Sequence, residues 1–182
     1  MNENGEDNAK ASQNRAGNKK FFRVVREQGK FVKDTEFHYK KHLKKAKHDL
    51  FRAGREFSDS CWDWTVIKAY YALFHAGNAL LSKKKGVFSK DHSCLIVALR
   101  YWNLVPEPIF IKLKTAYEGI SDIADIDIAF QIRKISQYDV DLWEEITEDN
   151  ARVILDIAKE MVKFAEDEIY GDLGKQGPEK GA

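Results

Sequence analysis

Apolar residues recur at the spacing of an α-helix through most of the chain, and this pattern predicts helices joined by short connections. The segment Trp62–Ser82 is apolar almost all the way round. Its polar interruptions are Asp63, Lys68, His75 and Asn78. A helix with so little polar surface must be covered on most sides, so we expect it at the centre of a core or of a subunit interface.

Four amphipathic segments accompany this central helix. They are a basic helix over about 36–57, one capped by Ser89 or Asp91, one beginning at Pro106 and Pro108, and one beginning at Thr147. Ser60 is expected to cap the N-terminus of the central helix, and Gly86 to end it after three lysines.

Strand-like alternation persists only over residues 121–128, where it has no partner, so we interpret that run as an acidic connection between helices. The predicted fold is therefore all-α, an up-down antiparallel bundle of four to five helices. Residues 1–18 contain no large apolar side chain after Met1 and are expected to be a disordered tail. The domain is expected over 19–170, with its core over 36–170 and a flexible tail over 171–182.

Charge is unevenly distributed although the net charge is only +1. Residues 19–55 contain 13 Lys and Arg against 4 Asp and Glu, whereas residues 144–170 contain 3 against 9. This asymmetry suits either a nucleic acid or acidic partner at the basic end, or a helix face that simply faces water. The first 18 residues lack the apolar stretch of a secretory signal and no segment resembles a membrane span, so we expect a cytoplasmic protein with reduced thiols.

Few residues suggest chemistry by themselves. His38 and His42 stand one helical turn apart, but neighbouring lysines disfavour a cation, so we expect neither a metal site nor a cofactor. Lys68, His75 and Asn78 fall near one another on the central helix and form a candidate polar site. A histidine in an apolar helix is more often structural than catalytic.

Three segments occur in an order that resembles a known family. They are the helix from Trp62 to Leu81, the run SKDHSCLI at 89–96, and RKISQYDVD at 133–141. Together they resemble small stand-alone HEPN domains (higher eukaryotes and prokaryotes nucleotide-binding), over about residues 36–170. The resemblance implies a helical bundle that forms a symmetric homodimer. Many such domains are metal-independent endoribonucleases or toxins paired with a nucleotidyltransferase antitoxin, and others bind RNA or nucleotides without catalysis.

The resemblance also implies a catalytic Arg followed four to six residues later by His, and the chain departs from this motif. Arg133 matches the arginine, but Tyr138 and Asp139 occupy the region of the histidine, and no Arg in the chain has a His at that spacing. A tyrosine is a poor proton acceptor at neutral pH, although it can donate a hydrogen bond to phosphate or stack on a base. His92 matches a position ahead of the third helix, where we expect it to hydrogen bond to backbone.

Three functions follow as hypotheses. The leading one is a non-catalytic or weakly catalytic homodimer that binds RNA, a nucleotide or a nucleotidyltransferase-type partner, with Arg133, Tyr138, Asp139, His75, His92 and Lys68 as candidate binding residues. The second is an endoribonuclease toxin in which catalytic Arg133 recruits His75 or His92. The third is a purely structural interaction module.

Overall fold

The computed structural model describes residues 29–122 and 146–171. Its elements in chain order are β1 (Phe31–Lys33), α2 (His38–Ser58), α3 (Trp62–Lys85), β2 (Val87–Ser89), α4 (His92–Tyr101), α5 (Glu107–Asp122) and α8 (Glu148–Tyr170). The all-α prediction is confirmed, and the described helices have the positions that the apolar pattern indicates. The two predicted tails and the acidic connection lie almost entirely outside the described residues.

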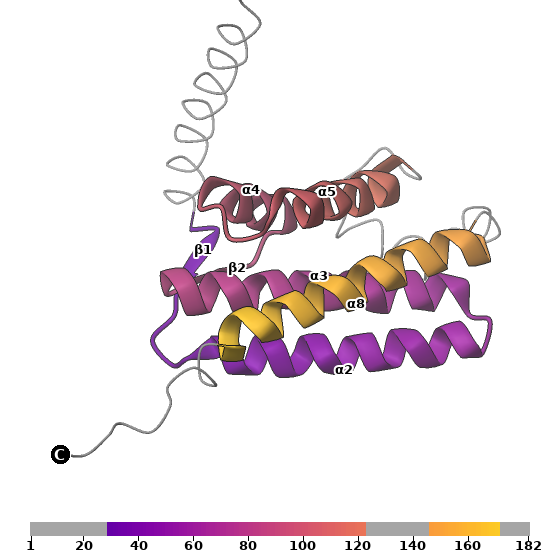
Figure 1. The fold of residues 1–182 in the computed structure, drawn as a ribbon, viewed down its shortest axis with the longest axis horizontal. Helices are drawn as coiled ribbons and strands as arrows, with labels where there is room; N and C mark the ends of the chain where they lie inside the picture. The colour runs from indigo at the N-terminus through magenta and orange to yellow at the C-terminus, as the bar shows by residue number, and fades with distance from the viewer. Residues whose placement is uncertain (1–28, 123–145, 172–182) are drawn as a thin grey trace, which may run out of the picture.

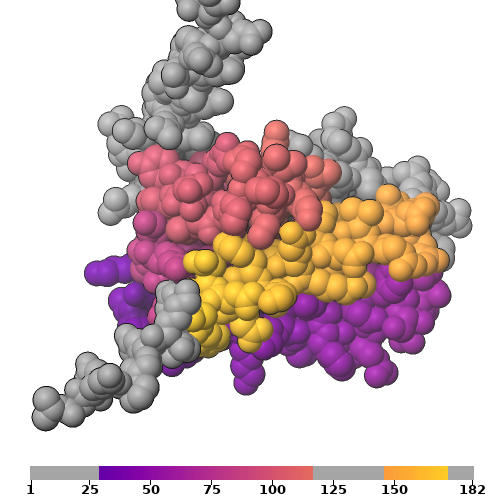
Figure 2. Space-filling model, viewed as in Figure 1, coloured from indigo at the N-terminus to yellow at the C-terminus, as the bar shows by residue number. Residues whose placement is uncertain are grey.

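The long helices α2, α3 and α8 pack side by side, and the shorter α4 and α5 lie along the other side of α3 and α8 (Figure 1). α2 and α3 form an antiparallel hairpin joined at Asp59–Cys61. In the space-filling view, α8 fills the front of the molecule between α2 on one side and α4 and α5 on the other (Figure 2). α3 is therefore enclosed by its own chain, which is the core position predicted for it.

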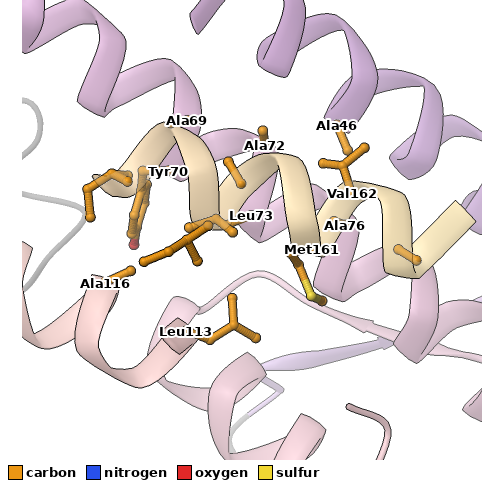
Figure 3. Close-up of a cluster of buried hydrophobic side chains, with 14 of the residues drawn as sticks. Ala46, Ala69, Tyr70, Ala72, Leu73, Ala76, Leu113, Ala116, Met161 and Val162 are labelled. Carbon is orange, nitrogen blue, oxygen red and sulfur yellow. The ribbon is translucent and has the colours of Figure 1, made fainter. Parts of the chain in front are cut away.

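The core is built around α3, whose small residues allow neighbouring helices to come close. Ala69, Ala72 and Ala76 are fully buried beside Leu73 and Tyr70. Figure 3 shows these side chains meeting Leu113 and Ala116 of α5, Met161 and Val162 of α8, and Ala46 of α2. One continuous apolar cluster thus joins α2, α3, α5 and α8.

Local sequence signals explain most of the helix ends. Gly86 ends α3 in a left-handed conformation with φ 65°, and its N–H donates to the Ser82 carbonyl at 2.9 Å, as expected from the sequence. Asp91 caps α4 by accepting from the Cys94 N–H, and Thr147 begins α8 in a capping box with Asn150. The prediction that Ser60 caps α3 is wrong, because Cys61 occupies the cap position without a side-chain hydrogen bond.

A short antiparallel sheet is absent from the sequence-based expectations. β1 pairs with β2 in a register that places Val32 opposite Phe88. β2 is fixed to α3 by Asn78, whose side-chain amide donates to the Ser89 carbonyl at 3.1 Å and accepts from the Ser89 N–H at 2.7 Å. Both strands have only three residues, which is too short for alternation to show in the sequence.

Candidate functional site

The candidate residues divide between described and undescribed parts of the chain. Arg133, Tyr138 and Asp139 lie outside the described residues. His75, Lys68 and His92 are described, and each has a different environment. These three side chains and the basic helix α2 are therefore the described candidates for binding or catalysis.

His75 is paired with a histidine of α2. Its Nδ1 lies 3.0 Å from Nδ1 of His42, and the two rings are tilted by 36° with centroids 5.3 Å apart. A hydrogen bond between two imidazole nitrogens requires that one carries the proton and the other offers its lone pair. The pair therefore joins α2 to α3 while at least one of its rings is neutral.

An acidic residue and an aromatic ring enclose the α2 side of this pair. Phe88 of β2 packs on both His38 and His42, with centroids at 5.2 and 5.3 Å. Asp34 Oδ1 lies 2.8 Å from Nδ1 of His38 and also accepts the His38 backbone N–H at 3.1 Å, while its other oxygen accepts from the Ser82 hydroxyl. The sheet thus covers the histidines, and Asp34 organises the start of α2.

Burial sets the protonation of the pair. It lowers the pKa of His42 to about 4, with further lowering by His75 and His38 and a smaller opposing effect of Asp34. Burial also lowers the pKa of His75. Asp49 opposes this effect, and Lys45 adds to it. For Asp34, burial alone would raise the pKa, but hydrogen bonds from Ser82 and His38 outweigh it and hold the pKa well below its usual range. Both imidazoles are consequently neutral at pH 7.

Asp49 is a buried carboxylate on the same side of α2. The residue is only 1% exposed, and its Oδ1 accepts from Lys45 Nζ and lies 3.3 Å from Nδ1 of His48. Within the described part of the chain its Oδ2 has no hydrogen-bond partner. A buried carboxyl group is costly without a partner, so Lys45 has a structural role here.

His92 is held by aromatic rings of α3. It stacks on Phe74 at 4.0 Å and on Tyr70 at 4.8 Å between centroids, and its Nδ1 is hydrogen bonded to the Tyr70 hydroxyl. These contacts connect the start of α4 to the middle of α3. The expected hydrogen bond from His92 to backbone stays a prediction.

The predicted polar line on α3 does not form one site. Lys68 Nζ lies 5.6 Å from the centre of the Trp64 ring, whereas His75 contacts His42 and Asn78 contacts the backbone of Ser89. Proximity on a helical wheel does not bring these groups together, because α2 and β2 each provide a separate partner. Asn78 is a structural residue.

The outer face of α2 carries most of its positive charge. It presents exposed side chains of Lys40, Lys41, Lys44, Lys45, Lys47, His48, Phe51, Arg52 and Arg55. Several pair with carboxylates, such as Lys41 with Glu36 and Arg52 with Glu56. Lys44 and Arg55 form no ion pair with any residue that the structure describes. We call this surface the basic face of α2.

Sequence reasoning misses three features of this region. The sequence predicts a solvated His42, although the spacing of this residue from Ala46 and Asp49 places it at the edge of the buried side of α2. Phe51 is 64% exposed in the middle of the basic face, and Phe37, at the start of α2, is 72% exposed. Periodicity alone cannot identify such exposed aromatic residues, because it treats every aromatic residue as a core candidate.

The chemistry available to these groups is binding and proton sharing. Among the described residues there is no group of three or more His, Cys, Asp and Glu side chains arranged to hold a metal ion. Both cysteines are free, and burial together with Asp91 raises the pKa of the Cys94 thiol to about 12, which makes it a poor nucleophile. No helix in the described ranges has the length and apolar character needed to cross a membrane.

Comparison with known proteins identifies a family for the domain. The family model described as "HEPN domain" matches residues 39–168, which include α2 except its first residue, α3, α4, α5 and all but the last residues of α8. No curated protein sequence matches the chain.

Proposed function

Because the chain belongs to the HEPN domain family, we propose that it is a non-catalytic or weakly catalytic RNA- or nucleotide-binding module that acts as a homodimer. The observation that supports binding most directly is the basic face of α2. Polyanion binding by proteins depends on lysine and arginine side chains that can reach phosphates, and releases counterions as they do so. The family model includes nearly the whole of α2.

The arrangement of charges on α2 supports a binding role beyond simple solvation. Lysines and arginines occupy successive turns of the exposed side, so a phosphate backbone lying along the helix would meet a cation at each turn. Phe51 adds an exposed ring among them. A base can stack on such a ring while its phosphates contact the neighbouring cations.

The histidine environments support weak or absent catalysis. A ribonuclease needs an imidazole that can reach the scissile phosphate and exchange protons near neutral pH. His75 is engaged with His42 and has a lowered pKa, and His92 is stacked on two rings. The chain also lacks an Arg with a His four to six residues downstream. Neither described candidate histidine is thus held as an accessible general base.

Homodimerisation and a nucleotidyltransferase-type partner are further parts of the proposal. α3 is largely enclosed within one chain, so the part of it open to a second copy is near Trp64 and Tyr71, both of which are exposed. Light scattering of the purified protein should give twice the mass of the 182-residue chain. A monomeric mass would contradict this part of the proposal.

The binding proposal is tested by reversing charge on α2. A Lys44→Glu/Arg55→Glu variant should bind a labelled single-stranded RNA at least tenfold more weakly than wild type. The slope of log K against log salt should fall by about 1.4, as expected from two lost contacts to single-stranded RNA. The matched control is Lys159→Glu/Lys163→Glu on α8, which changes charge equally and should bind as wild type does. Equal loss in both variants would contradict a role for this face.

The alternative function, an endoribonuclease toxin, is separated by a growth assay. If Arg133 and a recruited histidine cleave RNA, expression of wild type should arrest growth and Arg133→Ala should relieve the arrest. We expect no arrest from either chain. Toxicity that disappears with Arg133→Ala would instead favour the enzyme.

A further inference from the structure

Phe37 occupies a backbone position that glycine or asparagine would adopt more readily. It precedes α2 with φ 55° and ψ 43°, in the left-handed region. The other non-glycine residues with positive φ in the described ranges are Ser60 and Asn103, which are small and polar. A bulky aromatic residue is rare in this conformation, and Gly or Asn adopts it far more easily.

The Phe37 side chain contributes neither a helix cap nor core packing in return for that conformation. Its own side chain cannot cap α2, and the first backbone N–H of the helix, that of His38, is accepted by Asp34 instead. The residue is 72% exposed, the highest value of any large apolar residue in the described part of the chain, so it contributes little to the core. An exposed aromatic residue in an unfavourable backbone conformation is the kind of feature found at functional sites, which directs attention to contacts with a ligand.

The surroundings of Phe37 indicate what it contacts. Its ring packs edge-on against Tyr39, with centroids 6.3 Å apart. Two ammonium groups lie over the Tyr39 ring, Lys83 Nζ at 4.8 Å and Lys40 Nζ at 5.9 Å from its centre. The cluster thus combines the start of α2 with the end of α3. We call Phe37, Tyr39, Lys40 and Lys83 the aromatic–lysine cluster.

The charge around the cluster favours an anionic partner. Lys84 and Lys85 follow Lys83 in the last turn of α3, and Lys41 follows Lys40 in α2. The carboxylates beside them are Glu36, which pairs with Lys41 at 3.3 Å, Glu168, which pairs with Lys84 at 3.0 Å, and Asp34, which accepts from His38 and Ser82. Lys40 and Lys83 are not among the lysines paired by these carboxylates.

We infer that the aromatic–lysine cluster is a stacking site for an unpaired base of single-stranded RNA, with Lys40 and Lys83 contacting the adjoining phosphates. Exposed rings next to cations are the features with which proteins hold single strands, because every base offers a flat face and every nucleotide a phosphate. The site adjoins the basic face of α2 through Lys40, so one strand can contact both. This inference rests on the proposed RNA-binding function.

The test compares Phe37→Asn with wild type on two ligands, a labelled 12-nucleotide oligouridine and a duplex RNA of 12 base pairs. Asn suits the left-handed position, so the melting temperature should equal or exceed that of wild type. Affinity for oligouridine should fall by about 5- to 150-fold, the range for losing one stacked base. Affinity for the duplex should change by less than about twofold, because its bases are already stacked, and the salt slope should stay the same.

Two further variants make the result specific. Phe37→Trp should restore oligouridine binding, because the indole also stacks. Tyr170→Ala removes an aromatic residue from the end of α8, also exposed, and should bind both RNAs as wild type does. If wild type binds neither RNA, the proposed function itself fails. If wild type binds oligouridine with salt dependence and Phe37→Asn binds equally well, only this inference is overturned. It is likewise overturned if Phe37→Asn changes only the mass of the assembly.

Discussion

The two sides of α2 contain similar residue types, but one side is buried against α3 and the other is exposed to water. The side facing α3 holds His42 and Asp49, and the outer side holds His48, Phe51 and Arg55. On the inner side His42 meets His75, and Asp49 accepts from Lys45 through one of its two oxygens. On the outer side the charged groups face water, and their ion pairs are exposed.

This difference shows that burial and partners, and not residue type, separate structural groups from candidate binding groups. A histidine that shares a proton across a helix interface stabilises that interface as long as it remains neutral. A lysine on the open side contributes little to stability, because water screens it. Apart from Lys45, which pairs with the buried Asp49, the outer side can therefore serve binding without cost to the fold, and the following measurements test this division.

The largest contrast should come from matched truncations on α2. Leu43 is buried in the core, so Leu43→Ala should lower the free energy of unfolding by about 2–5 kcal/mol. Phe51 is mostly exposed on the same helix, and Phe51→Ala should change it by no more than about 0.5 kcal/mol. Urea unfolding followed by circular dichroism measures both. Similar losses in the two variants would remove the distinction between the sides.

A second, smaller effect should appear at the junction of α3 and β2. Asn78→Ala removes both hydrogen bonds to Ser89 and leaves buried backbone groups unpaired, which should cost about 1–3 kcal/mol. The control is Asn103→Gly, because Asn103 has a left-handed backbone that glycine adopts without strain. This substitution should leave the free energy of unfolding nearly unchanged. Hydrogen exchange should also show faster exchange of the Ser89 amide in Asn78→Ala. Unchanged protection of that amide would contradict the pairing.

The sequence was sufficient for the elements whose signals are local. The apolar stripe of α8, its cap at Thr147 and the glycine that ends α3 depend on residues within one or two turns, and all three predictions are confirmed. It was insufficient where a residue's role depends on a distant partner. His42 meets His75 across 33 positions of sequence, and Asn78 meets a strand that is too short to show its own pattern.

The candidate site was less predictable than the fold for the same reason. His75 stands out in the sequence as a polar residue in an apolar helix, but its partner is evident only once α2 is placed beside α3. The exposure of Phe37 depends on a turn in the left-handed region, for which a phenylalanine gives no sequence signal. The family match identifies the fold, and the roles of Arg133, Tyr138 and Asp139 stay predictions.

The inner side of α2 should also make stability depend on pH. The pKa of His42 is about 4 in the folded chain and near 6.5 when unfolded, so the unfolded chain binds more protons between these values. Stability is fully present above about pH 6.5 and falls as the pH drops toward 4, by at most about 1.4 kcal/mol per pH unit for this group. The groups facing His42 are His38 and Asp34 on its own side, His75 from α3 and the uncharged Phe88 from β2.

Urea titrations at pH 7 and pH 5 measure this dependence. His42→Phe should reduce the loss of stability between the two pH values, because it removes the group whose pKa is lowered to about 4 in the folded chain. The matched control is His48→Phe on the outer side, whose side chain is mostly exposed, and it should leave the loss as in wild type. An equal loss in all three proteins would show that the buried pair does not control the acid sensitivity.

The smallest effect should come from an ion pair on the exposed surface. Lys47 Nζ lies 2.7 Å from Glu166 Oε1 and joins α2 to α8, but about half of the Lys47 side chain is exposed. A double-mutant cycle with Lys47→Ala and Glu166→Ala should give a coupling energy of about 0.2–1 kcal/mol, decreasing as salt increases. A coupling of several kcal/mol would mean that the outer charges hold the bundle together. In that case the weaker RNA binding expected of charge-reversed variants could not be separated from damage to the fold, so a small coupling here is what allows the basic face of α2 to be tested as a binding surface.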